Sequence, residues 1–255
     1  IPIGEVAFDH EQAHSIAKNL NGCVVKSQIL GGGRGLGHFR ENGYQDGVHL
    51  VENADQAMDV AKNMIGNHLV TKQSGENGLP VHCVYIVEKI NIDLEMYMSI
   101  TLDRAAGCPV FVYSKAGGMS IEDVAHEDPS QIFKLHVNPF TGPEVEDLIK
   151  AADDLGIPDK KSQLVWTMKS LYDCFMAKDC DMVEINPLIT TKEGKILCAD
   201  SKITIDGNAG FRQKELVEME DITQVNEKEA HAAKYDLNYI HIGGNIGCLV
   251  NGAGL

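Results

Sequence analysis

Two short apolar stretches near residue 193 are typical of a β-hairpin, and they carry the first residues that could do chemistry. The stretches span 182–190 and 195–203, and the turn sequence Lys-Glu-Gly lies between them at 192–194. A three-residue loop that ends on a glycine in the left-handed region is a common hairpin connection. We therefore expect Gly194 to adopt that conformation, which fixes which residues of the two strands face each other.

In this register Asn186 lies opposite Asp200, Glu184 lies opposite Lys202, and the four side chains share one face of the sheet. Directly opposed side chains have Cβ atoms roughly 4.5–5.5 Å apart. One carboxylate oxygen and one amide oxygen at that distance can share Mg²⁺, which keeps several waters and takes phosphate oxygens as further ligands. The pattern is therefore compatible with a magnesium site on Asn186 and Asp200.

Two other interpretations of the hairpin stay open. A two-residue loop would shift the pairing by one residue and turn Asp200 to the opposite face of the sheet. In the expected register, the same residues could also form an ordinary solvated face, with one surface ion pair between Glu184 and Lys202.

A glycine-rich segment at 31–37 is the second candidate, because five of its seven residues are glycine. Backbone without side chains can approach a ligand closely. Together with Lys26 on the preceding strand and Arg34 inside the segment, it could hold a polyphosphate. It is neither a Walker A motif nor a dinucleotide fingerprint, since no G-x-x-x-x-G-K-[ST] occurs and Leu36 breaks the G-x-G-x-x-G spacing. The alternative is a flexible surface hairpin without a ligand.

Two glutamates flank the junction of two later strands. Glu88 ends an apolar strand and Glu95 begins the next one, so Glu88 could reach a nucleotide at a hinge. It could equally be a plain charge at a strand end. The ten histidines form no H-E-x-x-H motif, and no Ser/His/Asp arrangement has a recognisable context. The sequence therefore does not indicate a zinc peptidase or a serine hydrolase.

The elements that must hold these residues alternate between helix and strand. Asp9 and Asn53 are typical N-caps ahead of apolar residues spaced three and four apart. A longer helical pattern covers about 143–178 with a break near 156–158, and a short helix is expected near 226–235. Further strands are expected at 68–73, 81–89, 96–104 and 109–114. Because many of these strands follow one another closely, we expect antiparallel or mixed sheets in an α+β fold.

Composition limits the possible partners of the chain. Its 255 residues are 44% apolar, and 22 Lys and Arg against 37 Asp and Glu give a net charge of −15. Such an acidic chain repels nucleic acids and anionic membranes, although a few local cations could still hold a small anion. The seven cysteines contain no C-x-x-C pair, which favours reduced thiols. The chain begins without Met and ends inside an apolar glycine-rich segment, so we expect part of a longer protein.

Motifs along nearly the whole chain resemble the β subunits of succinate–CoA ligase (succinyl-CoA synthetase). They include VVKSQILGGGRG, LVTKQSGENG, YIVEKI, GGMSIEDVA, MVEINPL, GKILCADSKI, DGNAGFRQ and GNIGCLVNGAGL. The resemblance implies an ATP-grasp fold, in which two α+β subdomains enclose a nucleotide, and the truncated start of a CoA-ligase-type α/β domain. It also implies a ligase that converts a nucleoside triphosphate, succinate and CoA reversibly into the diphosphate, phosphate and succinyl-CoA. The phosphoryl group would travel through a histidine of a partner α subunit in a heterodimer.

The resemblance assigns roles to individual residues. Glu184 matches the catalytic glutamate that steadies the partner's phosphohistidine loop, and Asn251 matches an asparagine near the succinate. Asn186 and Asp200 match the two Mg²⁺ ligands. The positions that match contacts to the nucleotide, ATP/ADP or GTP/GDP, are Lys26, Gly33, Arg34, Gly35, Glu88, Asn91 and Glu95.

The resemblance also implies a division of the chain. An ATP-grasp domain is expected at 1–237, with one subdomain formed by about 1–20 plus 105–237 and the other by 21–104. The start of the CoA-ligase domain is expected at 238–255, so the chain alone should lack full activity.

Some positions depart from the family pattern or bear on its variants. Leu36 replaces a usual lysine and Gly243 replaces a usual aspartate. These departures keep open a non-catalytic nucleotide-binding module, and another acid–CoA ligase, such as malate–CoA ligase, stays a further alternative. The insert at 38–47 is similar to that of mitochondrial members and favours the mitochondrial matrix, with the bacterial cytoplasm as the alternative. Pro2 favours ATP over GTP.

Overall fold

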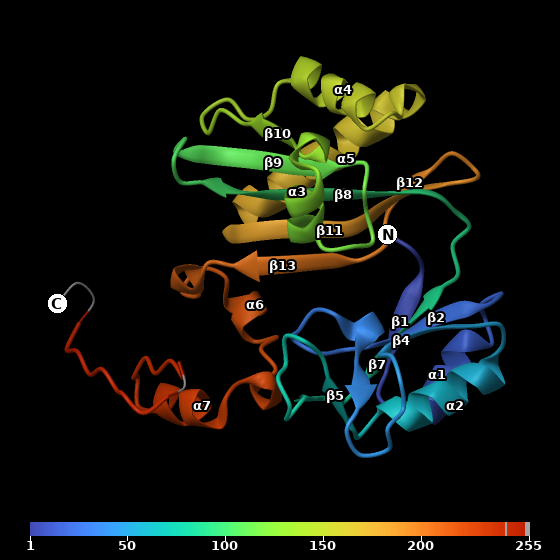
Figure 1. The fold of residues 1–255 in the computed structure, drawn as a ribbon, viewed down its shortest axis with the longest axis vertical. Helices are drawn as coiled ribbons and strands as arrows, with labels where there is room; N and C mark the ends of the chain where they lie inside the picture. Colours follow the sequence, from blue (N-terminus) through green and yellow to red (C-terminus); the bar gives the residue numbers. More distant parts are fainter. Residues whose placement is uncertain (243, 253–255) are drawn as a thin grey trace.

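The computed structural model of the protein describes residues 1–242 and 244–252 and has two lobes, which follow each other along the chain (Figure 1). Each lobe has a sheet of its own. Every strand pairing within the described residues is antiparallel, which agrees with the α+β prediction. The two lobes meet through residues of β2 and of the segment between β12 and β13, described below.

The first lobe has a four-stranded sheet and the helices α1 (His10–Ala17) and α2 (Ala54–Met64), which pack against each other. In spatial order the strands are β1 (Gly4–Ala7), β7 (Val84–Glu88), β2 (Cys23–Ser27) and β4 (Val48–Val51). A smaller sheet of this lobe contains β3 (His38–Phe39), β5 (His68–Val70) and β6 (Leu79–Pro80).

Both helices of the first lobe begin at the predicted caps. The Gln12 backbone N–H donates to the Asp9 carboxylate at 2.7 Å, and the Gln56 N–H donates to the Asn53 side chain at 3.0 Å. These bonds satisfy N–H groups that have no partner inside the helix. The side chain of Ala13 is fully buried, and its small size lets α1 approach the rest of the core.

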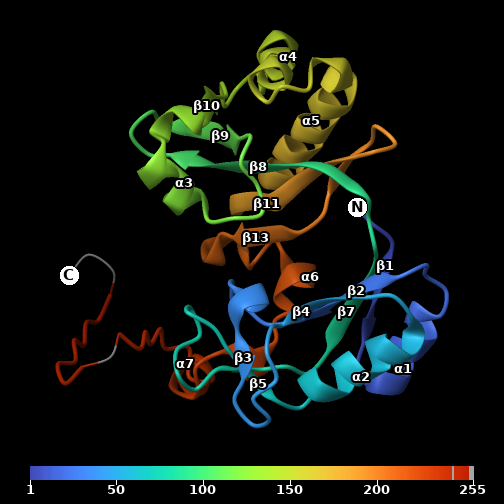
Figure 2. The same ribbon diagram turned by 45° about the vertical axis from the view of Figure 1, so that its right-hand side comes forward.

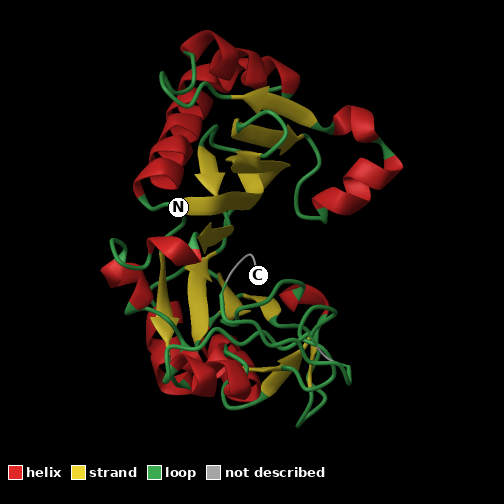
Figure 3. Cartoon of the chain, turned by 90° about the vertical axis from the view of Figure 1, so that its left-hand side faces the viewer, coloured by secondary structure: helices red, strands yellow, loops and turns green. Residues whose placement is uncertain are grey.

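The second lobe has a six-stranded sheet whose apolar face is covered by α4 (Val145–Asp154) and α5 (Lys161–Ala177). The strands are β10 (Phe133–His136), β9 (Cys108–Ser114), β8 (Ile92–Asp103), β11 (Cys180–Thr191) and β12 (Ile196–Cys198) in spatial order, with β13 (Ser201–Ile205) also paired to β11. The short helix α3 (Ile121–Glu127) lies on the other side of this lobe (Figures 2 and 3).

The predicted division into subdomains is wrong at both of its boundaries. Residues 1–20 do not join 105–237, because β1 pairs along its whole length with β7 and α1 completes the core of the first lobe. The prediction also assigned all of 21–104 to one subdomain. The whole of β8 instead belongs to the second lobe, since it pairs with β9 and β11.

After β13 the chain returns to the first lobe. It runs through α6 (Lys214–Val217), the 3-10 turn η5 (Ile222–Gln224) and α7 (Glu227–Ala233). The Gln224 side chain accepts from the Leu30 N–H at 3.3 Å and donates to the Pro80 carbonyl at 2.7 Å. The chain therefore crosses between the lobes a second time.

Most of the predicted elements are present. The long helical pattern is α4 and α5 with a break at Gly156, and the short helix near residue 230 is α7. The strand β10 and the helix α3 were not predicted, because both are short and half exposed. No described helix has the length and apolar character that crossing a membrane requires.

Candidate functional site

The hairpin between β11 and β12 has the predicted register. The Gly194 N–H donates to the Thr191 carbonyl at 2.8 Å, the Thr191 N–H donates to the Lys195 carbonyl at 2.9 Å, and Gly194 has φ +83°. Glu184 lies directly opposite Lys202, as expected. The three-residue loop is confirmed, and the two-residue alternative is excluded.

A glutamine of α5 holds this hairpin from the side. The Gln163 amide donates to the Gly194 carbonyl at 3.0 Å and accepts from the Ile196 N–H at 3.0 Å. Sequence reasoning did not find Gln163, since nothing in the helical pattern distinguishes it from other exposed polar positions. It fixes the strands that carry the candidate ligands to the body of the second lobe.

The two predicted metal ligands lie where the ladder is interrupted. Strand β12 ends before Asp200 and β13 begins after it, while Asn186 precedes a cis bond to Pro187. The Asn186 side chain accepts from the Gly118 N–H at 2.8 Å and donates to the Met119 carbonyl at 2.9 Å. The side chain of Asp200 turns to cations of the other lobe instead. Shared metal binding by Asn186 and Asp200 therefore stays a prediction.

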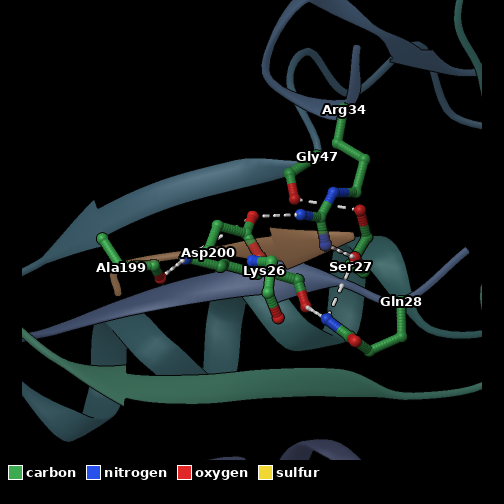
Figure 4. A network of polar contacts seen from close by, with 8 residues as sticks. Lys26, Ser27, Gln28, Arg34, Gly47, Ala199 and Asp200 are labelled. Atoms are coloured by element: carbon green, nitrogen blue, oxygen red, sulfur yellow. Dashed lines mark hydrogen bonds and ion pairs between the residues drawn. The ribbon is translucent and has the colours of Figure 1, made fainter. Parts of the chain in front are cut away.

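Two cations of the first lobe reach the second lobe at Asp200. The Arg34 Nη2 atom lies 2.5 Å from the Asp200 Oδ2 atom, and the Lys26 Nζ atom lies 3.9 Å from it. Lys26 also donates to the Ala199 carbonyl at 3.1 Å, and Arg34 donates to the Ser27 carbonyl at 3.1 Å (Figure 4). The structure thus brings the two cations predicted for the glycine-rich segment to the Asp200 carboxylate predicted for the hairpin.

This contact is shielded from water more on its cationic side. The side chains of Lys26 and Arg34 are 15% and 19% exposed, whereas that of Asp200 is 37% exposed. Burial lowers the pKa of the Lys26 ammonium, the Asp200 carboxylate counteracts this shift, and the Arg34 charge adds to it. The arrangement is a partly desolvated anion site whose present anion is a carboxylate of the protein.

The glycine-rich segment is held above this contact by two glutamines. Gly33 has φ +73° and leads into a single 3-10 turn, η1 (Arg34–Leu36). The Gly32 N–H donates to the Gln73 side chain at 2.8 Å, and Gln224 accepts from the Leu30 N–H. The N–H groups of Leu30 and Gly32, which could bind phosphate, are therefore already paired with side-chain amide oxygens. Sequence reasoning missed both glutamines, because each lies far along the chain from the segment that it contacts.

Glu184 lies on the sheet face opposite the α4 and α5 helices. It faces Ser99 on β8 and Lys202 on β13. Burial raises the pKa of the Glu184 carboxyl, the nearby Glu122 charge adds to the rise, and the Lys202 charge and the Asn186 amide oppose it. Acidic side chains from α3 and β11 thus meet one lysine on this face.

The remaining predicted nucleotide contacts lie at the first crossing between the lobes. The Glu88 carboxylate accepts from the Ile3 N–H at 2.8 Å, so it is bonded within its own lobe. The Asn91 carbonyl accepts from the Lys192 N–H at 3.1 Å. Glu95 lies on β8 opposite Ile189, with its carboxylate close against Gly118. Their contacts to a nucleotide remain predictions.

Asn251 is not brought to the site. It is exposed and lies after α7, in a described stretch without helices or strands. Its predicted contact with succinate is therefore untested, and Gly243 lies outside the described residues. Gly35 lies in η1 with open space where a side chain would begin.

The donor chemistry fits a hard cation more than a transition metal. Asp200 offers a carboxylate and Asn186 an amide oxygen, which suit Mg²⁺. Within residues 1–242 and 244–252, no three His, Cys, Asp or Glu side chains gather closely enough to hold a metal. A cation here would need phosphate or water oxygens to complete its coordination, as a magnesium–nucleotide complex supplies.

Comparison with known proteins identifies relatives of this chain. Residues 1–190 match the ATP-grasp domain family. The chain is 46% identical to the mitochondrial ADP-forming succinate–CoA ligase subunit beta of Dictyostelium discoideum, over 100% of this chain and 58% of that protein. It is 44% identical to the mitochondrial subunit beta of Saccharomyces cerevisiae, over 100% of this chain and 61% of that protein. It is 45% identical to the ADP-forming succinate–CoA ligase subunit beta of Rhodopseudomonas palustris, over 100% and 66%. The chain therefore spans about three fifths of these relatives.

Solved structures with a similar fold are more distant in sequence. ATP citrate lyase from Methanothrix soehngenii, in complex with citrate and coenzyme A, has a TM-score of 0.64 at 18% identity and covers 91% of this chain and 53% of its own. The dinucleotide-forming acetyl-coenzyme A synthetase 1 of Ca. Korarchaeum cryptofilum has a TM-score of 0.56 at 14% identity, over 81% and 87%. At these identities the likeness shows the fold alone, and it agrees with the expected two-lobed architecture.

Proposed function

The chain belongs to the ATP-grasp family, and from this we propose that it supplies the nucleotide site of an ADP-forming succinate–CoA ligase β subunit. The reaction would convert ATP, succinate and CoA reversibly into ADP, phosphate and succinyl-CoA. One observation carries the proposal beyond family membership. Lys26 and Arg34 of one lobe converge on Asp200 of the other, so the cations and the candidate metal ligand already lie together between the lobes.

In this function the first lobe binds the phosphates of the nucleotide. Lys26 and Arg34 supply positive charge, while the backbone at Gly33 and Gly35 allows close approach. The Asp200 carboxylate now occupies the position of an anion beside both cations. When phosphate oxygens bind there, the cations exchange one anionic partner for another, so little charge needs to be reorganised.

Asn186 and Asp200 would hold Mg²⁺ in this site. When bound, the ion would neutralise the phosphate oxygens and stabilise charge on the transferring phosphoryl group. Other residues of the chain hold these two candidate ligands in place. Asn186 is fixed by Gly118 and Met119, and Gln163 holds the hairpin that carries both ligands.

The other assignments follow the family match and the positions described above. Glu88, Asn91 and Glu95 lie along the crossing between the lobes and would contact the nucleoside part of ATP or ADP. Glu184 would steady the phosphohistidine loop of a partner α subunit. Asn251 would contact succinate once the rest of the CoA-ligase domain is in place.

The relatives support a choice of nucleotide and bear on the compartment. Relatives from both mitochondria and bacteria are named ADP-forming, which supports ATP over GTP and agrees with Pro2. The insert at 38–47 supports the mitochondrial matrix over the bacterial cytoplasm. These assignments, like the heterodimer with an α subunit, concern the whole protein, of which this chain is a part.

A binding experiment with the full-length β subunit in its αβ complex tests the proposal. Asp200→Ala should abolish Mg²⁺-dependent binding of ADP in titration calorimetry. Asp181→Ala removes an exposed carboxylate at the start of β11, the strand that pairs with both β12 and β13, and should leave that binding within about twofold. GDP in place of ADP tests the nucleotide, and succinate beside malate in the complete reaction tests the acid. Unchanged ADP binding by the Asp200 variant would refute the assigned site.

A further inference from the structure

Lys202 is the cation of this site that has no role so far. We propose that Lys202 binds the phosphoryl group while it passes between the nucleotide and the histidine of the partner subunit. This inference rests on the proposed function and adds a catalytic residue to it.

The register fixes the position of Lys202. It lies on β13 directly opposite Glu184, which in turn lies directly opposite Ser99 on β8. Opposed side chains in such pairs have Cβ atoms roughly 5 Å apart. Lys202 also follows Asp200 by two residues, at the start of β13. Lys202 therefore lies between the candidate metal ligand and the glutamate assigned to the partner's loop.

Its ammonium is available to a ligand. Lys202 is exposed, and within the described part of the chain its ammonium makes no hydrogen bond and no ion pair within 4.0 Å, although its backbone is paired with β11. Lys26 and Arg34 differ in this respect, because both already contact Asp200. Among Lys26, Arg34 and Lys202, only Lys202 can bind a further anion without losing a side-chain contact to another described residue.

The surroundings require such a cation. Three carboxylates, those of Glu122, Glu184 and Asp200, lie around this region, and the whole chain carries a charge of −15. A phosphoryl group that enters here would meet like charge at short range. The glycine-rich segment offers no lysine at its tip, where Leu36 is 94% exposed. Lys202 supplies positive charge from the second lobe, whereas Lys26 and Arg34 belong to the first lobe.

The step that Lys202 would assist is a simple group transfer. In the direction of triphosphate synthesis, the bond between phosphorus and the histidine nitrogen breaks, and its electron pair stays on the imidazole. A terminal oxygen of the diphosphate forms the new bond to phosphorus, and the released imidazole takes up one proton from water. The transferring group carries negative charge throughout, and a fixed cation beside it lowers the barrier.

The test uses the full-length αβ enzyme, phosphorylated on the α subunit. Transfer of phosphate to ADP is followed in single-turnover quench experiments, and Kd for Mg-ADP is measured separately. Lys202→Gln should slow the transfer at least roughly tenfold and leave the Kd within about twofold. Lys202→Arg should restore most of the rate, because the charge is kept. The control is Lys195→Gln, an exposed lysine at the other end of the same hairpin, and it should transfer at the wild-type rate.

The possible results separate the two proposals. If the wild-type enzyme transfers no phosphate to ADP, the proposed function fails. If the wild type transfers and Lys202→Gln does so equally fast, the inference about Lys202 fails alone. A loss of Mg-ADP binding in Lys202→Gln would also overturn it, since Lys202 would then serve the nucleotide instead of the group in transit.

A second measurement needs no variant and so does not depend on correct folding of one. Wild-type enzyme is treated with an amine-acetylating reagent in its phosphorylated and dephosphorylated forms, and the modified lysines are quantified by mass spectrometry. Acetylation of Lys202 should be at least roughly threefold slower in the phosphorylated form, while that of Lys195 stays the same. Equal acetylation of Lys202 in both forms would contradict the proposal.

Discussion

Arg34 and Asp200 join the two lobes although 166 residues separate them along the chain, with their Nη2 and Oδ2 atoms 2.5 Å apart. The carboxylate is the predicted metal ligand and the guanidinium is the predicted phosphate contact. Before a nucleotide binds, Asp200 therefore lies where Arg34 would bind phosphate, and Arg34 lies where Asp200 would bind the metal ion. The pair holds the site together with little exposed charge, and it can exchange partners when phosphate enters.

Removing the guanidinium tests this exchange. Arg34→Gln should weaken binding of Mg-ADP by roughly tenfold or more, because a charge-assisted hydrogen bond to phosphate contributes about 1.5–3 kcal/mol. Titration calorimetry on the full-length complex measures the change. Arg104→Gln, in the exposed turn between β8 and β9, is the matched control. Wild-type affinity in the Arg34 variant would show that this side chain serves only the contact between the lobes.

A substitution at Leu36 should tighten nucleotide binding instead of weakening it. It lies 94% exposed at the tip of the glycine-rich segment, where the family pattern has a lysine. Leu36→Lys should tighten Mg-ADP binding about threefold at low salt, and the gain should shrink as salt screens the added charge. Leu36→Gln introduces a polar side chain without charge and should bind as the wild type does. An equal gain with glutamine would exclude an electrostatic cause.

We expect Gln163 to contribute both to the stability of the fold and to the binding of Mg-ADP. Gln163→Ala removes two hydrogen bonds to the hairpin backbone and should lower the free energy of unfolding by about 1–2 kcal/mol. Denaturant titration measures this loss, with the exposed neighbour Ser162→Ala as control. Mg-ADP binding should weaken as well, since the hairpin carries both candidate ligands. A less stable variant with unchanged binding would separate the hairpin anchor from the site.

Glu41 predicts how the stability of the first lobe depends on pH. The His68 backbone N–H, which lies 2.7 Å from the carboxylate, is the largest of the contacts that lower the pKa of Glu41 from 4.5 to about 2. The folded state therefore holds the proton less tightly than the unfolded state does. The resulting stabilisation is complete above about pH 5 and is lost as the pH falls through 4.5 towards 2.

A pair of variants measures this effect. Glu41→Gln should lower Tm at pH 7, and the difference from the wild type should shrink as the pH is lowered from 5 to 2. Glu76→Gln, an exposed carboxylate of the same lobe, should leave Tm nearly unchanged at pH 7. A difference between wild type and Glu41→Gln that stays constant from pH 7 to pH 2 would contradict the prediction.

Local patterns predicted local structure well. The loop at Gly194 set the register of the hairpin, since a three-residue turn permits one pairing only, and Asp9 and Asn53 set the helix starts. The assignment of residues to lobes could not be derived in this way. β1 is only four residues long, and its partner β7 lies about eighty residues later, so nothing in the neighbourhood of β1 reveals the pairing.

The site could be predicted residue by residue but not as a set of contacts. The sequence predicts Lys26 and Arg34 as one pair of cations and Asp200 as part of another site, whereas their convergence depends on how the lobes pack. Gln73 and Gln224 carry no signal of their own in the sequence. Their role arises because a side-chain oxygen comes within reach of the Gly32 and Leu30 N–H groups once the chain is folded.

The return of the chain through η5 has a mechanical consequence. The chain connects the lobes at two places. The first is 89–91, and the second is the return from β13, where the Gln224 side-chain amide is hydrogen-bonded to both Leu30 and Pro80 of the first lobe. Two connections between the lobes restrict how one lobe can rotate relative to the other. They favour rotation about the line that joins the two connections. We therefore expect the lobes to separate by a hinge rotation when a nucleotide enters, and Gln224 would transmit that rotation to Leu30, the residue before the glycine-rich segment.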